Sequence, residues 1–148
     1  MSLPPAVAAP SEAELASRLR LVVTRLARRL RTQLPGELSP SQLATLATVE
    51  RMGPLTLGEL SGAERVKPPT MTKIVACLEE QGFVSRTVDR SDRRVAHVEA
   101  TAAGLHFIDQ SRRKKDAYLA ERLRSLTPED RVALERAAAV LERLLEDS

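Results

Sequence analysis

Residues 67–73 combine the side-chain types that proteins use to touch both the bases and the phosphates of DNA. Threonine hydroxyls can donate or accept hydrogen bonds, threonine and proline carbons can contact a thymine methyl group, and lysine can contact phosphate or guanine. Arg65, just before this stretch, is a further candidate for a backbone contact. The alternative is that the threonines only occupy an exposed helical turn. The residues predicted to contact DNA here are Lys67, Pro68, Pro69, Thr70, Thr72 and Lys73.

A second basic stretch, residues 89–94, holds three arginines within five positions. The weakly hydrated guanidinium group suits a narrow, strongly negative minor groove. Asp92 can hold one of these arginines in position through a bidentate pair. The alternative is a solvated turn of mixed charge. The contacts predicted in this region are Arg86, at the DNA backbone, and Arg90, Asp92, Arg93 and Arg94.

The elements that must position these stretches are a short helix and a hairpin. The pattern predicts a helix that begins at Pro68 and is stopped by Gly82, followed by two short strands on either side of residues 89–94. A helix end that fits a major groove, beside a hairpin that can reach a minor groove, is typical of a winged helix-turn-helix domain. The core-facing residues predicted for this helix are Met71, Ile74, Val75 and Leu78.

The N-terminal region divides into an arm and a helix. Residues 1–10 are rich in proline and alanine and lack an apolar period, so a flexible arm is expected. Over residues 15–34, leucine and valine recur at steps of three and four residues, which is typical of an amphipathic helix. Pro35-Gly36 is expected to end that helix.

Four further helix starts are marked by capping residues. Ser39 and Thr56 open capping boxes, and Thr101 and Thr127 precede the last two helices. The predicted order is helix, helix, short helix, helix, strand, strand, long helix, helix, with a residue pair near Leu55 as a candidate third strand. The fold class is therefore mostly α with a small β-hairpin wing. No parallel sheet is expected, because strands and helices do not alternate.

Length and composition favour one domain without a membrane segment. The chain has 148 residues, of which 43% are apolar and 2% aromatic, and this predicts a core of leucine, valine and alanine. No run approaches the ~18 apolar residues that span a bilayer, and the first residues lack a signal-peptide pattern. A soluble, cytoplasmic protein with no membrane partner is expected. The single cysteine, Cys77, excludes an internal disulfide framework.

The net charge of +3 is modest, so its distribution carries more information. Residues 61–94 hold seven basic against five acidic residues, whereas residues 127–148 hold three basic against six acidic residues. The acidic tail is therefore expected to lie away from a phosphate-facing surface. The basic run at residues 112–115 is interpreted as a solvated helical face, with DNA contact as the alternative.

Five motifs follow one another along the chain: Leu57-x-x-Leu60, Thr70-x-Thr72-Lys73, Leu78-Glu79-x-x-Gly82-Phe83-Val84-x-Arg86, Asp89-x-x-Asp92-Arg93-Arg94 and Thr101-x-x-Gly104. With them, the chain resembles the MarR family of bacterial transcription regulators over residues 12–146. The resemblance implies a winged-helix fold, a homodimer, and repression through a pseudo-palindromic operator, with release by a small-molecule effector of unspecified identity. The chain departs from the family at Pro68-Pro69, where small polar residues are common.

The same resemblance implies one domain over residues 11–148, with a winged-helix lobe over about 39–100 and dimerisation helices over about 11–35 and 102–147. Leucines left exposed on those helices would form a large apolar patch, so a second copy of the chain is expected to cover them. Packing within one chain is the alternative. A two-fold dimer would present half-sites about 10 bp apart. The leucines predicted at the interface are Leu15, Leu19, Leu141, Leu144 and Leu145.

Other functions have weaker support in the sequence. The chain has no GxSxG motif and no glycine-rich phosphate loop, so an enzyme is not expected. Cys77, His97 and His106 lack metal-site spacing, so no metal or other cofactor is expected, and Cys77 is interpreted as a core residue rather than a redox switch. The alternative function is a winged helix used for protein association or an auxiliary role, with little sequence-specific DNA binding.

Overall fold

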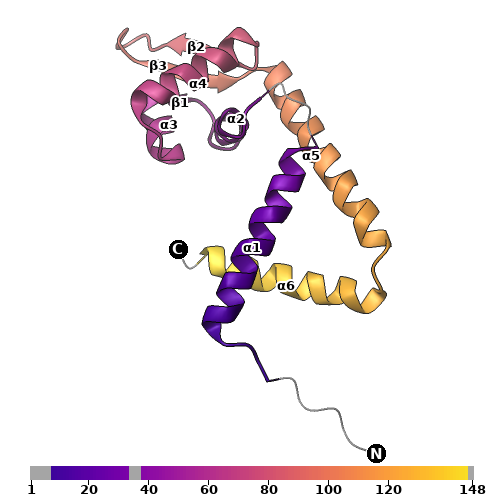
Figure 1. Cartoon of the computed structure of the whole chain (residues 1–148). Coiled ribbons are helices and arrows are strands. Elements are labelled where there is room, and N and C mark those ends of the chain that lie inside the picture. Colours follow the sequence, from indigo (N-terminus) through magenta and orange to yellow (C-terminus); the bar gives the residue numbers. More distant parts are fainter. Residues whose placement is uncertain (1–7, 34–37, 147–148) are drawn as a thin grey trace, which may run out of the picture. The chain divides into compact units, whose positions relative to one another are not determined.

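The computed structural model describes residues 8–33 and 38–146. The chain divides into two compact units, residues 1–35 and residues 36–148. The order of helices and strands is the predicted one, and the expectation of a single domain over residues 11–148 stays a prediction. The elements are α1 (Glu12–Arg31), α2 (Pro40–Met52), β1 (Leu55–Thr56), α3 (Leu57–Glu64), α4 (Pro68–Glu80), β2 (Val84–Val88), β3 (Ala96–Ala100), α5 (Ala102–Arg124) and α6 (Pro128–Glu146) (Figure 1).

The first unit contains α1, which side chains cap at both ends. The amide of Glu14 donates to the Ser11 hydroxyl at 3.2 Å, and the amide of Ser11 donates to the Glu14 carboxylate at 3.1 Å. At the other end, the hydroxyl of Thr32 donates to the carbonyl of Arg29 at 2.8 Å. The helix ends at Arg31.

Two predictions for the N-terminal region fall largely outside the described residues. The expected helix stop at Pro35-Gly36 lies there entirely. Of the expected arm at residues 1–10, only residues 8–10 are described, and they are exposed and neither helical nor in a strand.

A core rich in leucine and valine holds together α2, α3, α4 and the sheet, which form the winged-helix lobe. Alanine, which composition predicts in this core, is exposed or half-buried throughout the described residues. The reason is that most alanines lie on α1, α5 and α6, helices that contribute only Ile108 to the core. The buried apolar residues are Leu46, Val49, Leu55, Leu60, Met71, Ile74, Val75, Leu78, Val84, Val98 and Ile108.

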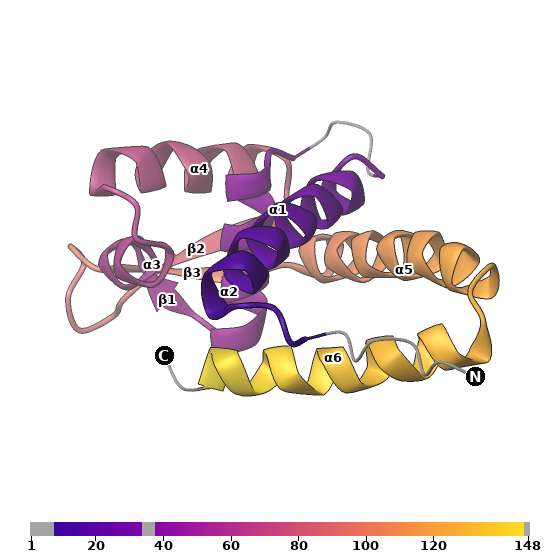
Figure 2. The same cartoon turned by 60° about the horizontal axis from the view of Figure 1, so that its bottom comes forward.

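The three strands form an antiparallel sheet in the order β1-β3-β2. Val98 in the central strand lies opposite Leu55 of β1 and Arg86 of β2, so the third strand predicted near Leu55 is confirmed. Figures 1 and 2 both show α4 running along the β2–β3 hairpin, and α4 packs on β2. The helix and the hairpin that carry the predicted DNA contacts therefore belong to one packed body.

The start of α5 is fixed against the turn that follows α4. The Thr101 hydroxyl accepts from the Gly104 amide at 3.1 Å and donates to the carbonyl of Gly82. Gly82 has a left-handed φ of 77°. A Cβ atom on Gly104 would stand 2.1 Å from the Phe83 carbonyl oxygen, so glycine alone fits there. The Thr101-x-x-Gly104 motif thus has a structural role, which is to join α5 closely to the hairpin.

A bidentate ion pair also joins α2 to α5. Arg112 donates to the two carboxylate oxygens of Glu50 at 3.0 and 2.7 Å. These hydrogen bonds lower the pKa of Glu50 and raise the pKa of Arg112. The next residue, Arg113, pairs with Asp109 at 3.0 Å. The first two arginines of the basic run at residues 112–115 therefore form ion pairs within the protein. This favours the interpretation that the run is not part of the DNA-binding site.

The last helix, α6, is exposed along its length except at half-buried Leu141. The predicted cap is confirmed, because the amide of Asp130 donates to the Thr127 hydroxyl at 3.1 Å. None of the helices within residues 8–33 and 38–146 is both long enough and apolar enough to cross a membrane.

Candidate nucleic-acid interface

The predicted contact residues at the start of α4 share an exposed surface. Four core residues, confirmed as predicted, define the buried side of the helix. Because an α-helix turns about 100° per residue, Pro69 and Lys73 lie opposite that side. Ala76 is also exposed and lies on the same surface, but it was not among the predicted contacts. Its spacing of seven residues, or about two helical turns, from Pro69 is the sequence signal that places it on this surface. The exposed predicted residues are Lys67, Pro68, Pro69, Thr70, Thr72 and Lys73.

The N-terminus of α4 has few free amide groups. Pro68 and Pro69 occupy the first two helical positions and carry no N–H, and the amide of Met71 donates to the Lys67 carbonyl at 3.0 Å. Only the amide of Thr70 is left to an outside partner in this turn. The helix end therefore has less capacity to bind a phosphate through backbone N–H groups than an ordinary helix N-terminus.

The two threonines of this surface differ in what they offer. The Thr72 hydroxyl donates to the Pro68 carbonyl at 3.0 Å, so its proton is used within the helix. An outside partner meets the acceptor oxygen and the methyl group of Thr72. Thr70 has no hydroxyl hydrogen bond within the described residues, so it can still donate.

At the tip of the hairpin, Asp92 holds Arg94. The Arg94 side chain donates to both carboxylate oxygens, at 3.1 Å from Nε and 3.3 Å from Nη2, and its amide donates at 3.0 Å. These bonds lower the pKa of Asp92. The predicted bidentate pair is therefore present, and Arg94 is the arginine that it holds.

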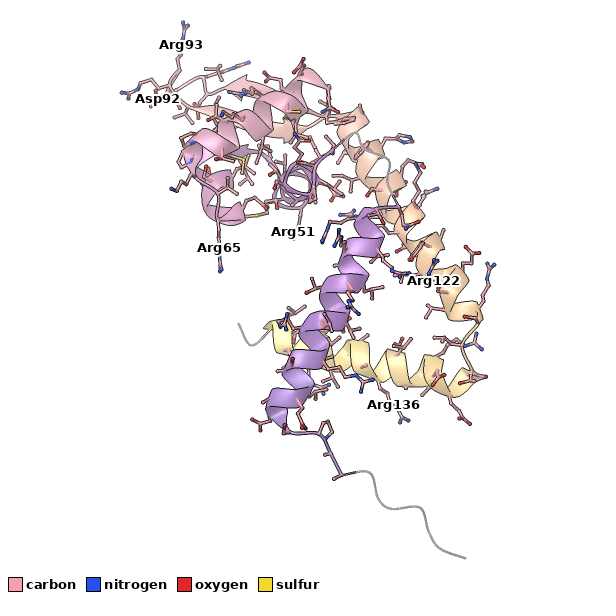
Figure 3. All side chains as sticks on the ribbon, in the orientation of Figure 1. Arg51, Arg65, Asp92, Arg93, Arg122 and Arg136 are labelled. Carbon is pink, nitrogen blue, oxygen red and sulfur yellow. The ribbon has the colours of Figure 1, made fainter. Side chains whose placement is uncertain are left out.

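A second aspartate shapes the same turn. The Asp89 carboxylate accepts from the hydroxyl and the amide of Ser91 at 2.5 and 2.8 Å, and these bonds lower the pKa of Asp89. Arg90 and Arg93 are exposed, and neither forms an ion pair within the described residues. Figure 3 shows Arg93 extending outward from the hairpin tip. The turn thus fixes one arginine and leaves two available for an external partner.

Arg86 lies between the helix and the hairpin. Its Nε is 3.3 Å from a carboxylate oxygen of Glu79 in α4, and 29% of its side chain is exposed. Arg86 therefore helps to hold the hairpin against α4, and its contact with DNA stays a prediction. A shallow cleft brings Arg86 and Arg94 together with the start of α3, an arrangement that the sequence pattern did not indicate. The cleft is lined by Thr56, Leu57, Gly58, Arg86, Arg94, Val95 and Ala96.

The turn between α3 and α4 has an unusual backbone at Arg65. Its φ is 53°, and among the residues that the structure describes no other non-glycine residue has a positive φ. The amide of Val66 closes the turn by donating to the Ser61 carbonyl at 3.0 Å. In Figure 3 the Arg65 side chain points away from the lobe in the direction opposite to Arg93. We therefore do not group Arg65 with the hairpin arginines.

The leucines predicted at a dimer interface are accessible within their own units. Leu15 of α1 is 44% exposed, and Leu145 of α6 is 77% exposed. Leu144 is also exposed, while Leu19 and Leu141 are half-buried. Additional exposed apolar residues lie on the same two helices: Leu21, Val22, Val23 and Leu26 of α1, and Val132, Leu134 and Val140 of α6.

Cys77 lies at the edge of the core rather than inside it. It is half-buried on α4, and the side-chain amide of Gln81 donates to its sulfur at 3.3 Å. The interpretation of Cys77 as a core residue is therefore wrong, because its position on the helix falls between the buried and the exposed sides. Within the ranges that the structure describes, no group of three or more histidine, cysteine or acidic side chains is placed to hold a metal ion.

This combination of a three-helix lobe, an exposed α4 surface and an arginine-bearing hairpin defines a winged helix-turn-helix protein. The model of the MarR family matches residues 38–96. Over 139 residues, the chain is 40% identical to a protein of Mycobacterium leprae named uncharacterized HTH-type transcriptional regulator ML2140. The aligned residues cover 93% of this chain and 97% of that protein. The chain belongs to the MarR family, and it is a transcription regulator rather than an enzyme.

Two further comparisons agree with this assignment. A MarR family protein from Bacillus stearothermophilus has a similar structure, with a TM-score of 0.74 and 30% identity over 93% of this chain and 99% of that one. The HTH-type transcriptional repressor MdtR of Bacillus subtilis is 29% identical over 108 residues, or 73% of this chain and 70% of that protein. The predicted fold class, mostly α with a small β-hairpin wing in a winged helix-turn-helix domain, is confirmed, and the hairpin belongs to a three-stranded antiparallel sheet.

Proposed function

We propose that this regulator is a repressor that binds a pseudo-palindromic operator as a homodimer and is open to release by a small-molecule effector. The observation that carries the proposal is that the exposed α4 surface lies beside a hairpin that packs against α4. Arg90 and Arg93 of this hairpin have no ion-pair partner among the residues that the structure describes. A relative of this chain is named a repressor, which supports the direction of control.

The α4 surface is the proposed major-groove reader. Lys67 and Lys73 are exposed at its start, and neither is in an ion pair within the described residues. Their charges are available to phosphates, whose neutralisation supplies most of the sequence-independent affinity for DNA. Pro68, Pro69, Thr70 and Thr72 then lie closest to the base edges.

The hairpin is the proposed minor-groove contact. Arg93 extends freely, and Arg94 is held by Asp92 with its remaining Nη1 available. A held guanidinium loses less side-chain freedom when it enters a groove, so part of the cost of ordering it is already met in the free protein. Arg86, Arg90 and Asp92 complete the proposed site.

The homodimer rests on the exposed apolar residues of α1 and α6. Water-exposed leucine and valine over two long helices are unusual for a monomer and typical of an interaction surface. A two-fold pair of these chains would carry two α4 surfaces and two hairpins, which requires an operator with two related half-sites.

The test is selection of bound fragments from random or host DNA by the purified protein, followed by titration across salt concentrations. A repressor of this kind selects a sequence with two-fold symmetry, and its affinity falls steeply as salt rises. Recovery of no preferred sequence would instead favour the alternative function, a winged helix for protein association.

A further inference from the structure

The start of α4 is chemically unlike a phosphate-binding helix end. Its first two residues are prolines, so two of the three amides that would point at an anion are missing and the Thr70 amide remains. Both pyrrolidine rings are exposed. The tip of the helix therefore presents carbon where hydrogen-bond donors are usual.

The carbon surface continues along the exposed side of the helix. Pro69, Thr72 and Ala76 stand three and four residues apart, so they lie next to one another on one side. The Thr72 hydroxyl is turned back to Pro68, so neither Pro69, Thr72 nor Ala76 has a free side-chain hydrogen-bond donor. All three side chains are small, which lets the helix backbone approach the floor of a groove closely.

In the major groove, the thymine 5-methyl group is the apolar feature of the base edges. Guanine, adenine and cytosine present acceptors and amino groups there, and burying those against carbon without a partner costs free energy. A strip of small apolar side chains, with Lys73 on the same exposed side and Lys67 at the start of the helix, thus matches a groove floor that carries methyl groups beside the phosphate backbone.

We propose that the strip formed by Pro69, Thr72 and Ala76, with Pro68 beside it, selects operators through thymine 5-methyl groups in each half-site. This inference rests on the proposed DNA-binding function and adds the base feature that is recognised. Lys67 and Lys73 provide affinity that does not depend on sequence.

The experiment uses the full chain and the operator duplex obtained by selection. Each thymine of a half-site, with its symmetry mate, is replaced in turn by deoxyuridine, which removes the 5-methyl group and keeps the base pairing. Dissociation constants are measured for the unaltered protein, for Pro69→Ala and for Thr72→Ser, which keeps the hydroxyl and removes the methyl group. Pro40→Ala is the matched control, because Pro40 opens α2 as Pro68 opens α4. Thermal melting of each variant checks folding.

The expected result is a loss of about fourfold per buried methyl group at one or more thymines, and about sixteenfold when both half-sites lose that methyl. For Pro69→Ala or Thr72→Ser, replacing thymine by deoxyuridine should cause little or no loss of affinity. For Pro40→Ala, the loss of affinity should be as large as for the unaltered protein. Equal binding of thymine and deoxyuridine duplexes at every position overturns the inference but leaves the repressor proposal standing. The inference is also overturned if deoxyuridine weakens binding of both α4 variants as much as it weakens binding of the unaltered protein. Failure to select any operator removes the proposed function itself.

Discussion

Asp92 holds Arg94 through two side-chain hydrogen bonds, yet 91% of the Arg94 side chain remains exposed. The pair therefore orients the guanidinium without covering it. A surface ion pair of this kind adds little to folding stability. Its value is in fixing a charged group at the tip of a hairpin, where DNA is proposed to bind.

The first prediction concerns Arg93 and Arg94, the two adjacent arginines near the tip of the hairpin. Arg93→Ala and Arg94→Ala should each weaken operator binding by about 1–3 kcal/mol, the scale of a good groove contact. Folding should be unaffected, because both side chains are exposed. Fluorescence anisotropy with a labelled operator measures the change.

Arg113→Ala is the matched control for Arg94→Ala. Arg113 is also exposed and also paired with an aspartate, Asp109, but it lies on α5. Its removal should leave operator affinity nearly unchanged. Unaltered binding of both hairpin variants would remove the hairpin from the proposed site.

The second prediction is that the hairpin tip is insensitive to pH near neutrality. Hydrogen bonds from Arg94 lower the pKa of Asp92, so the ordering that this carboxylate provides is present above the ordinary aspartate range and is lost as pH falls through the lowered pKa. The Arg94 Nε–H signal in NMR spectra should therefore be constant from about pH 5 to 8 and change only below about pH 4. Titration of that signal near pH 6 would contradict the assignment to Asp92.

The third prediction tests the close approach of α5 to the hairpin. Gly104→Ala should destabilise the protein by about 2–4 kcal/mol, because its Cβ would stand 2.1 Å from the rigid Phe83 carbonyl oxygen. Gly62→Ala is the control, since no atom lies within 4 Å of the added methyl group and the site is helical. That variant should gain about 0.5–1 kcal/mol. If Gly104→Ala and the unaltered protein had the same free energy of unfolding in chemical denaturation, the close approach of Gly104 to the Phe83 carbonyl would be contradicted.

Much of the fold can be read from local signals in the sequence. Ser39 and Thr56 each stand three residues before a glutamine or glutamate, and both form the expected capping boxes. The four core residues of α4 follow helical spacing. Such features depend on neighbours within one turn of helix, so they survive without knowledge of the tertiary structure.

The details of the site depend on contacts between distant residues and could not be read in the same way. Arg86 is drawn to Glu79 only because β2 packs beside α4. The cleft that joins Arg86 and Arg94 to the start of α3 needs β1 to pair with β3. The use of the Thr72 hydroxyl within α4 is local, but a threonine in a helix can also point outward, so the sequence left that choice open.

The fourth prediction concerns assembly. Leu15→Glu and Leu145→Glu should each convert the proposed dimer to a monomer in sedimentation velocity, because both side chains are exposed within their own units and a buried charge in the interface would lack a partner. Val88→Glu changes a similarly exposed apolar residue on β2 and should leave the dimer intact. In the two leucine variants, the melting temperature of the lobe should be unchanged. Their operator affinity should fall, because two half-sites are no longer bound together. A wild-type chain that sediments as a folded monomer at micromolar concentration would contradict the two-half-site proposal.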